Sequence, residues 1–389
     1  MKTYRVAILG CRGRGGAAGR AYHAHPRMEV VGLCDLVKER VDTLGDELGV
    51  AARYDDLDAM IVETKPDIVA IPTGTEFHYP LSMRVLEHGV HIEVEKPICV
   101  ELHQADDVLA KASEKGVRVA IHHQSRSGGA MRAIHRAVAD GRIGRLRHIN
   151  GSGKGYYGGY GLLNIGTHSL NSMMKLTGHC RRVYATARTD GRPIDPDDVM
   201  PSPSGMGTLA GESISAHMEF DGGVTATLLQ QRMPVVDKAG HILEVLGTEG
   251  RALFNTTHGA WLLGTASSLP DGEHDAWQRL EAEVPDSYDP GSCGPLDDYW
   301  FVEEFVDALD EGRDHESSGA EGTHVLEIIM GIFESAAYGR PVDLPQAERD
   351  HPLLRWRREN GFGDPGPMPR PYYEWLHAEA ERLGRGTQA

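Results

Sequence analysis

A lysine and a carboxylate stand where they could bind and polarise a small polar substrate. Glu95 and Lys96 follow the alternating valine and isoleucine run Val90 to Val94, which predicts a strand, and Pro97 then ends it. Open parallel sheets bind ligands in the crevice beyond the carboxyl ends of their strands, so this pair is expected to point into a cleft. Lys96 is therefore the candidate reaction centre, and the competing interpretation is a solvated lysine at a strand end.

A second set of polar side chains recurs at helical spacing. Asn164, His168 and Asn171 stand at i, i+4 and i+7, so on a helix they would share one face. An ammonium and an imidazole can divide alcohol oxidation, because the ammonium stabilises the forming alkoxide while the imidazole takes the proton. A structural histidine is the competing interpretation. Tyr156 and Tyr157, set among glycines, are predicted to shape a sugar pocket, against the alternative of an ordinary aromatic hairpin.

The N-terminus carries a glycine turn of the kind that binds phosphate. Val6 to Leu9 predicts a short buried strand, Gly10-Cys-Arg-Gly13-Arg-Gly15 follows, and a helix is predicted over Ala17 to His25. Backbone N–H groups and a helix N-terminus meet at such a turn, and both favour a phosphate. Arg12 stands where the commonest dinucleotide-binding fingerprint has its second glycine. The interpretation as a phosphate-binding turn therefore depends on the position of the glycines between a strand and a helix.

Asp35 sets the expected cofactor. It ends the strand predicted over Glu29 to Cys34 and lies about 20 residues past Gly15, where dinucleotide-binding folds place the acid that holds the adenosine ribose. A carboxylate accepts hydrogen bonds from a ribose diol and repels a 2′-phosphate, so NAD is favoured over NADP. Three cations near the turn could offset that repulsion: Arg12, Arg14 and Lys38.

The segments that must position these residues change character along the chain. Up to His122 mostly apolar strands alternate with helices, which predicts an α/β Rossmann domain with a doubly wound parallel sheet over residues 1–122. Beyond it, strands such as Ser213 to Phe220 and Val224 to Arg232 are joined by short turns, which predicts antiparallel pairing in an α+β domain over 123–345. Residues 346–389 are expected to form a tail that packs on the body or on a neighbouring subunit.

Composition limits the classes of partner and compartment. The chain has 389 residues, a formal net charge of −17 and five widely spaced cysteines. An acidic chain without a Lys/Arg stripe is a poor partner for nucleic acid or anionic membranes, and unpaired cysteine spacing fits a reducing, cytoplasmic setting. No metal is expected, because His122-His123 and His179-Cys180 lack metal-ligand spacing with a third partner. Two stretches rich in Pro, Gly, Ser and Asp, 195–211 and 256–294, are predicted to be long loops.

Taken together, these motifs resemble the glucose-fructose oxidoreductase / inositol dehydrogenase / MocA (Gfo/Idh/MocA) oxidoreductases. The resemblance runs from about Val6 to Pro345 and includes Pro72-Thr-Gly-Thr-Glu-Phe-His78, Glu95-Lys96-Pro97 and Leu246-Gly-Thr-Glu-Gly250. It implies a Rossmann domain followed by a domain built on a large open, mostly antiparallel sheet. That sheet would form the interface of a homodimer or homotetramer.

The resemblance also implies roles for single residues. Lys96 would hydrogen-bond the reacting oxygen and His168 would act as acid and base. Many members carry an aspartate where this chain has Asn164, and an amide can bind a hydroxyl but cannot stabilise an imidazolium by charge. Hence the proton relay differs, or the reaction runs mainly as a reduction, or Asn164 recognises a substrate hydroxyl. The predicted substrate contacts are Asn164, Tyr156, Tyr157 and Arg126. The predicted cofactor contacts are Gly10, Arg12, Gly13, Arg14, Asp35, Thr73, His78, Glu95, Lys96 and Gln124.

The expected function is an NAD-dependent dehydrogenase that acts on a secondary hydroxyl of a sugar, glycoside or cyclic polyol. One alternative is a redox-neutral enzyme that retains its NAD and oxidises a glycoside only transiently. A second is a non-enzymatic dinucleotide sensor, and the presence of both Lys96 and His168 counts against it.

Overall fold

The computed structural model describes residues 2–233, 241–256, 258–265 and 277–366, together with residues 374, 378 and 381. They form two compact units. The first comprises Met1–Cys99, His103–Gly129 and Glu283–Thr323, and the second Val100–Leu102, Ala130–Ala282 and His324–Ala389. This division differs from the predicted boundary at residue 122, because a later segment of the chain returns to the first unit.

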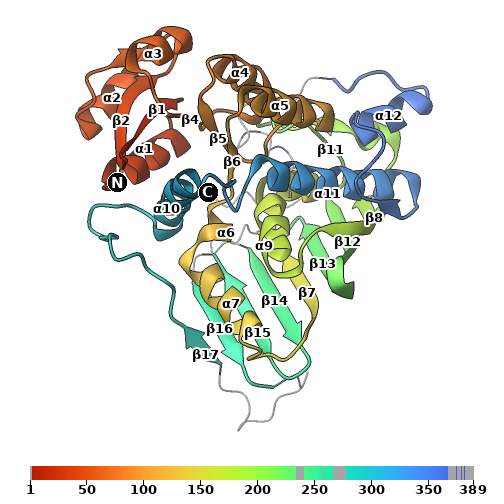
Figure 1. Cartoon of the computed structure of the whole chain (residues 1–389). Helices are drawn as coiled ribbons and strands as arrows, with labels where there is room; N and C mark the ends of the chain where they lie inside the picture. Colours follow the sequence, from red (N-terminus) through yellow and green to blue (C-terminus); the bar gives the residue numbers. More distant parts are fainter. Residues whose placement is uncertain are drawn as a thin grey trace. The chain divides into compact units, whose positions relative to one another are not determined.

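The first unit is built on a six-stranded sheet in the order β3-β2-β1-β4-β5-β6, and all its strand pairs are parallel. β4 and β6 are buried at every residue, as expected of strands covered on both faces. The predicted doubly wound sheet is thereby confirmed (Figure 1). Its strands are β1 (Tyr4–Leu9), β2 (Met28–Cys34), β3 (Arg53–Tyr54), β4 (Ile68–Ile71), β5 (His91–Glu95) and β6 (Val119–His122).

Helices connect these strands. They are α1 (Arg14–Ala24), α2 (Lys38–Leu48), α3 (Leu57–Thr64), α4 (Thr75–Glu87) and α5 (Leu102–Lys115), and the short α6 (Gln124–Ser127) follows β6. β2 and β4 flank β1 on opposite sides, so the chain reverses its direction across the sheet there. Ligands of open α/β sheets bind beyond the carboxyl ends of the strands at such a reversal.

Helix α10 (Leu296–Glu311) is the segment that returns to the first unit. It packs against α1, and Figure 1 shows the two helices next to each other. Phe301 and Phe305 of α10 join Ile8 of β1 and Tyr22 of α1 in one buried cluster. Helix α10 therefore completes the core of the first unit.

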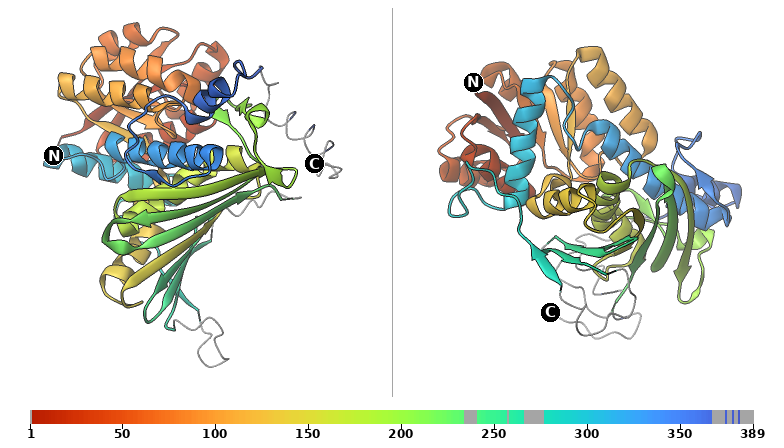
Figure 2. Two further views of the ribbon diagram at one scale, coloured as in Figure 1. Left: turned by 90° about the vertical axis from the view of Figure 1, so that its right-hand side faces the viewer. Right: turned by 60° about the horizontal axis from the view of Figure 1, so that its bottom comes forward.

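The second unit is built on a ten-stranded sheet in the order β17-β16-β15-β14-β7-β13-β12-β8-β18, with β9 paired to β8. β7 and β13 pair in parallel, and the other pairs are antiparallel. This confirms the predicted large, mostly antiparallel sheet (Figure 2). Its strands are β7 (Leu146–Ser152), β8 (Cys180–Thr189), β9 (Arg192–Pro193), β12 (Ser213–Phe220), β13 (Thr225–Gln231), β14 (Ile242–Gly247), β15 (Arg251–Asn255), β16 (Gly259–Leu263), β17 (Gln278–Leu280) and β18 (Val342–Asp343).

The loop predictions were wrong in part. β16 and β17 lie within the segment predicted as a loop over 256–294, and β10 (Met200–Pro201) and β11 (Thr208–Leu209) lie within the one over 195–211. These strands have only two to five residues. So short a strand carries little periodicity of its own, and pairing with a neighbour defines it.

The helices of the second unit are α7 (Gly129–Ala139), α8 (Gly158–Gly161), the π-helix η1 (Leu162–Gly166), α9 (Thr167–Thr177), most of α11 (Gly319–Tyr338) and α12 (Pro352–Glu359). Part of the predicted tail belongs to this unit: His351 Nε2 lies 3.1 Å from the carbonyl of Thr208. The tail prediction beyond residue 366 falls almost wholly outside the described residues. No helix of the described chain is both long and apolar enough to cross a membrane.

Candidate active site

The glycine turn lies at the carboxyl edge of the parallel sheet, between β1 and α1. Gly10 and Gly13 have φ of +108° and +47°, in the region that favours glycine. A Cβ on Gly15 would lie 1.8 Å from the carbonyl oxygen of Gly10, so the chain passes too close for any side chain. Nothing lies within 4 Å of a Cβ built on Gly13, the N-cap residue of α1. This open backbone at a helix N-terminus fits a phosphate group.

Asp35 stands beside this turn, as its spacing predicted. One carboxylate oxygen accepts a hydrogen bond from the Cys11 N–H at 2.9 Å, and the other accepts one from the Val37 N–H at 2.9 Å. Arg40 is the nearest cation that the structure pairs with it, at 3.6 Å. Lys38 instead binds Asp42 at 2.6 Å. The carboxylate is thus held at the carboxyl end of β2, where it could accept hydrogen bonds from a ribose.

Thr73 and His78 lie next to the turn. A Cβ on Gly10 would come within 3.1 Å of the Thr73 methyl group. The His78 ring lies 2.8 Å from the carbonyl oxygen of Pro97 through Nδ1 and 3.2 Å from that of Thr73 through Nε2. Burial lowers the pKa of His78, and the two carbonyl contacts oppose that shift. The ring therefore joins the residues that follow β4 to those that follow β5.

Arg14, the first residue of α1, does not extend into solvent. Its guanidinium binds Asp298 of α10 at 2.9 Å and Glu95 of β5 at 3.2 Å. One of its nitrogens, Nη2, also lies 2.6 Å from Nε2 of His122 at the end of β6. We call Arg14, Glu95, His122 and Asp298 the Arg14 cluster. It connects the glycine turn to the strand end that precedes Lys96.

The Arg14 cluster continues into the interior of the first unit. Nδ1 of His122 lies 2.5 Å from a Glu93 oxygen, and the hydroxyl of Tyr22 donates to the same carboxylate. Burial opposes the charged imidazole, but the charge of Glu93 and the hydrogen bonds to Asp298 and Glu93 outweigh it and raise the pKa of His122 to about 9. Burial likewise opposes an ionised Asp298, but His122 and Arg14 hold the pKa of that carboxyl well below its usual range.

Lys96 directly follows β5, and the charge of its ammonium acts on His123, in the segment after β6. Burial, and then the charges of Lys96 and Arg126, keep the pKa of His123 well below its usual value. Arg126 is itself buried and binds Glu321 at 3.1 Å. Lys96 and Arg126 therefore both lie near His123. Among the described residues, Oε1 of Gln124 is buried without a hydrogen-bond partner, which leaves an acceptor for a ligand in this segment.

The helix that carries His168 is present in the second unit, but its first part differs from the predicted regular helix. Leu162–Gly166 is π-helical, and α9 begins at Thr167. π-Turns are frequent at functional sites. Asn164 lies in this turn, where its amide donates a hydrogen bond to the Tyr160 hydroxyl at 3.1 Å. His168 is 8% exposed and its ring stacks on that of His241, with 6.0 Å between the ring centres.

The π-turn packs against β13. The Gln230 amide of that strand lies so near that a Cβ on Gly153 or Gly161 would come within 1.9 or 2.8 Å of its oxygen. A larger residue at either position would therefore require the Gln230 side chain to move. Tyr157 is buried, while the partly exposed Tyr156 meets the ring of Tyr160 edge to face at 5.5 Å. Of the two predicted substrate tyrosines, Tyr156 is thus the more accessible.

The first unit brings together the predicted residues of the glycine turn, Asp35, Thr73, His78, Glu95 and Lys96. The second unit contains the other predicted residues, Asn164, His168, Tyr156 and Tyr157. The meeting of Lys96 with His168, which belong to different units, stays a prediction. Among the described residues no group of three His, Cys, Asp or Glu side chains is placed to hold a metal ion.

Sequence reasoning missed several residues of the two sites. They are Tyr22, Glu93, Asp298, Gln230 and His241, and His122 was considered only as a metal ligand. Glu93 offered a local signal, because it is an acid within a strand predicted to be buried. Asp298 had none, because its partners lie far away in the sequence.

Comparison with known proteins decides the family. Residues 4–123 match the oxidoreductase family GFO_IDH_MocA, with its NAD-binding Rossmann fold, and residues 131–253 match the GFO/IDH/MocA C-terminal domain. The chain belongs to the Gfo/Idh/MocA family. The match to the NAD-binding Rossmann fold lies almost wholly within the first unit, and the match to the C-terminal domain covers β7 to β14 of the ten-stranded sheet.

Relatives within the Gfo/Idh/MocA family include sugar dehydrogenases. D-apiose dehydrogenase of Paraburkholderia graminis is 25% identical over 370 residues, which are 91% of this chain and 93% of that protein. D-glucoside 3-dehydrogenase of Escherichia coli is 28% identical over 189 residues, 45% of this chain and 54% of that protein. A solved structure of levoglucosan dehydrogenase with NADH and levoglucosan shares the fold, with a TM-score of 0.73 at 20% identity, over 89% of this chain and all of that one.

Proposed function

We propose that the protein is an NAD-dependent oxidoreductase that transfers a hydride between a secondary hydroxyl of a sugar, glycoside or cyclic polyol and nicotinamide. The observation that carries the proposal is the position of Lys96. It follows β5 at the same edge of the parallel sheet as the glycine turn and Asp35. Ligands of open α/β sheets bind at this edge, so the Lys96 ammonium is placed where it could contact one.

The residues of the first unit fit a dinucleotide. Gly10, Gly13 and Gly15 leave room for a pyrophosphate at the N-terminus of α1, and Asp35 suits the ribose hydroxyls. NAD is favoured over NADP, because the Asp35 carboxylate would repel a 2′-phosphate. Of the nearby cations, Lys38 binds Asp42, Arg14 binds Asp298 and Arg40 pairs with Asp35 itself. NAD⁺, when bound, supplies the hydride acceptor.

The protein's own groups would divide the remaining work. The Lys96 ammonium would donate a hydrogen bond to the hydroxyl oxygen and stabilise the negative charge that develops as its proton leaves. The His168 imidazole would accept that proton, while the hydride passes from the carbon that bears the hydroxyl to NAD⁺. Asn164, held by Tyr160, would recognise a neighbouring hydroxyl. The sugar dehydrogenases among the relatives support a carbohydrate substrate.

A panel of aldoses, glycosides and cyclic polyols, followed by NADH absorbance, tests this function. We expect one class to reduce NAD⁺ better than NADP⁺. His168→Asn is expected to lower kcat by about 10² to 10⁴, whereas His179→Asn, at an exposed position of the same unit, should leave it unchanged.

Two outcomes of the panel would redirect the proposal. Conversion of a glycoside without added NAD, by protein that purifies with bound nicotinamide, would favour the redox-neutral alternative. Folded protein that binds NAD but converts no member of a broad panel would favour the sensor.

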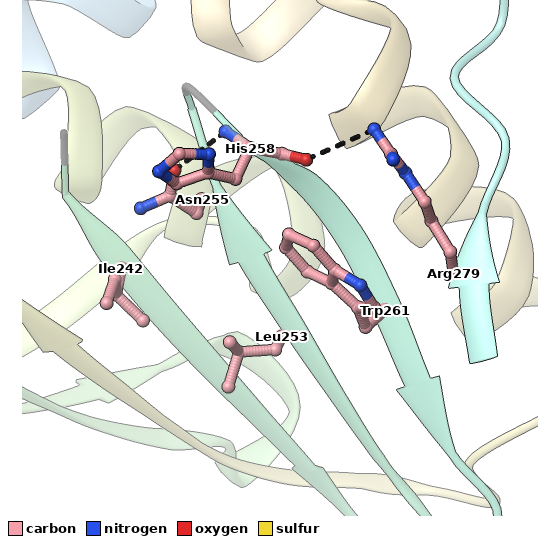
Figure 3. Close-up of a pocket in the computed structure, with 6 residues that line it drawn as sticks. All are labelled: Ile242, Leu253, Asn255, His258, Trp261 and Arg279. Carbon is pink, nitrogen blue, oxygen red and sulfur yellow. Dashed lines mark hydrogen bonds between the residues drawn. The ribbon is translucent and has the colours of Figure 1, made fainter. Parts of the chain in front are cut away.

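We further propose that the protein assembles as a homodimer or homotetramer through the ten-stranded sheet. Figure 3 shows Ile242, Leu253 and Trp261 side by side on β14 to β16, where they line a pocket of about 520 Å³. Tyr184 and Leu229, on other strands of the sheet, are also exposed. Apolar patches of this kind mark interaction surfaces.

Light scattering tests this assembly. The measured mass should be two or four times the 42.5 kDa chain mass, and Trp261→Glu should reduce that mass. A monomer at micromolar concentration would contradict the proposed assembly.

A further inference from the structure

The Arg14 cluster has the geometry of a positioning device. Arg14 stands between Gly13 and Gly15 in the glycine turn, and Glu95 directly precedes Lys96. We propose that Asp298 and His122 are positioning residues: through Arg14 they hold the phosphate-binding turn in register with the strand end that carries Lys96. This inference rests on the proposed function, in that NAD is taken as the ligand of the turn.

The turn needs support of this kind because it is built from glycines. Two of its residues have positive φ, and no atom lies within 4 Å of a Cβ built on Gly13. Glycine has the largest conformational freedom to lose on ordering. The Arg14 side chain ties the turn to the buried Asp298 with a bidentate contact, at 2.9 and 3.4 Å. A fixed guanidinium therefore fixes the backbone on either side of it.

The same guanidinium acts on the other half of the site. Its Nε lies 3.2 Å from Glu95 Oε2, and Glu95 is the last residue of β5. A rotation of this strand end would move both Glu95 and Lys96. With Glu95 held by Arg14, and Arg14 held by Asp298, the ammonium and the turn keep one relative position within the first unit. Preorganisation of this kind is what a hydride-transfer site requires.

The charges favour this reading over a simple surface ion pair. The side chains of Asp298 and His122 are each 2% exposed, and that of Arg14 is 37% exposed. Burying charged groups is costly unless each has a partner, and removing one partner leaves another uncompensated. His122 lies between Asp298 at 2.9 Å and Glu93 at 2.5 Å, so it gives the buried Asp298 carboxylate a second partner beside Arg14.

Helix α10 offers a matched control. Asp310, on the same helix as Asp298, binds Arg27 and the hydroxyl of Tyr4. Tyr4 begins β1 and Arg27 precedes β2, so this pair lies at the amino edge of the sheet. Both aspartates attach α10 to the first unit by contacts with an arginine, but Asp298 is the one whose arginine belongs to the turn.

The experiment is a double-mutant cycle on NAD⁺ affinity in the full-length protein. Arg14→Gln, Asp298→Asn, the double variant and Asp310→Asn are titrated with NAD⁺ by calorimetry, and each is melted. We expect each single change in the Arg14 cluster to raise Kd about tenfold. The double variant should be within about twofold of Arg14→Gln, because Asp298 acts through Arg14. Asp310→Asn should lower Tm while its Kd stays within about twofold of the wild type.

Three results would overturn the proposal. They are an unchanged Kd in folded Asp298→Asn, factors that multiply in the double variant, or an equal loss of affinity in Asp310→Asn. If Asp298→Asn does not fold, the cycle of Arg14→Gln with Glu95→Gln decides by the same criterion, since both of those side chains reach the surface. Wild-type protein that fails to bind NAD⁺ would instead reject the proposed function.

Discussion

Lys96→Met is expected to lower kcat by about 10³ while the Kd for NAD⁺ changes by less than about threefold. Methionine keeps most of the length of the side chain but removes the ammonium. The developing alkoxide would then lose its nearest cation, and losing one such donor typically costs about 10² to 10³ in rate. Steady-state kinetics with a substrate found in the panel, together with calorimetric NAD⁺ titration, measure the two quantities separately.

Lys115→Met is the control for this change. Lys115 ends α5 and binds Glu87 at 2.9 Å, so its removal should leave both quantities unchanged. If folded Lys96→Met kept kcat within tenfold of the wild type, Lys96 could not be the group that stabilises the alkoxide. If it lost NAD⁺ affinity as strongly as kcat, Lys96 would be a cofactor contact and the chemistry would need another cation.

Gly15→Ala is expected to abolish measurable NAD⁺ binding, with a Kd at least about 100 times higher. The new Cβ would stand 1.8 Å from the Gly10 oxygen and 2.8 Å from its carbonyl carbon. Because both atoms are backbone, relief requires the turn itself to open, and the backbone N–H groups would move away from the phosphates. Overpacking also costs about 1 to 3 kcal/mol of stability, which thermal unfolding would show as a lower Tm.

Gly49→Ala separates strain from loss of the site. Gly49 has φ of +68° at the end of α2, and a Cβ added there would have no atom within 4 Å. An L residue there costs roughly 1 to 2 kcal/mol, so Tm should fall while NAD⁺ binding persists. Equal NAD⁺ affinity in Gly15→Ala and the wild type would mean that the turn does not bind the phosphates.

Much of the first unit could be predicted because its signals are local. A buried strand, a glycine turn and a helix occur in sequence order, and the position of Asp35 follows from strand and helix lengths. Lys96 was found in the same way, from a strand followed by proline. The Arg14 cluster could not be found like this. Its members come from the turn, from β5, from β6 and from α10, and no periodicity in one segment reveals a partner in another.

The site of the second unit shows the same limit at short range. Spacing placed Asn164 and His168 on one helix, and the structure confirms the helix. Asn164 lies in a π-turn that packs against β13, and His168 lies in the α-helix that follows. A helical-wheel argument assumes a constant turn angle, which the π-turn does not keep.

The return of α10 has a consequence for how the protein is made and how it can be divided. During translation the first unit cannot complete its core until Phe301 and Phe305 have left the ribosome, because Ile8 and Tyr22 pack against the same buried cluster. A gene fragment that stops at residue 122 would encode all six parallel strands and still leave that face uncovered. Exchange of the second unit between relatives would therefore need three junctions in the gene, near residues 129, 282 and 323.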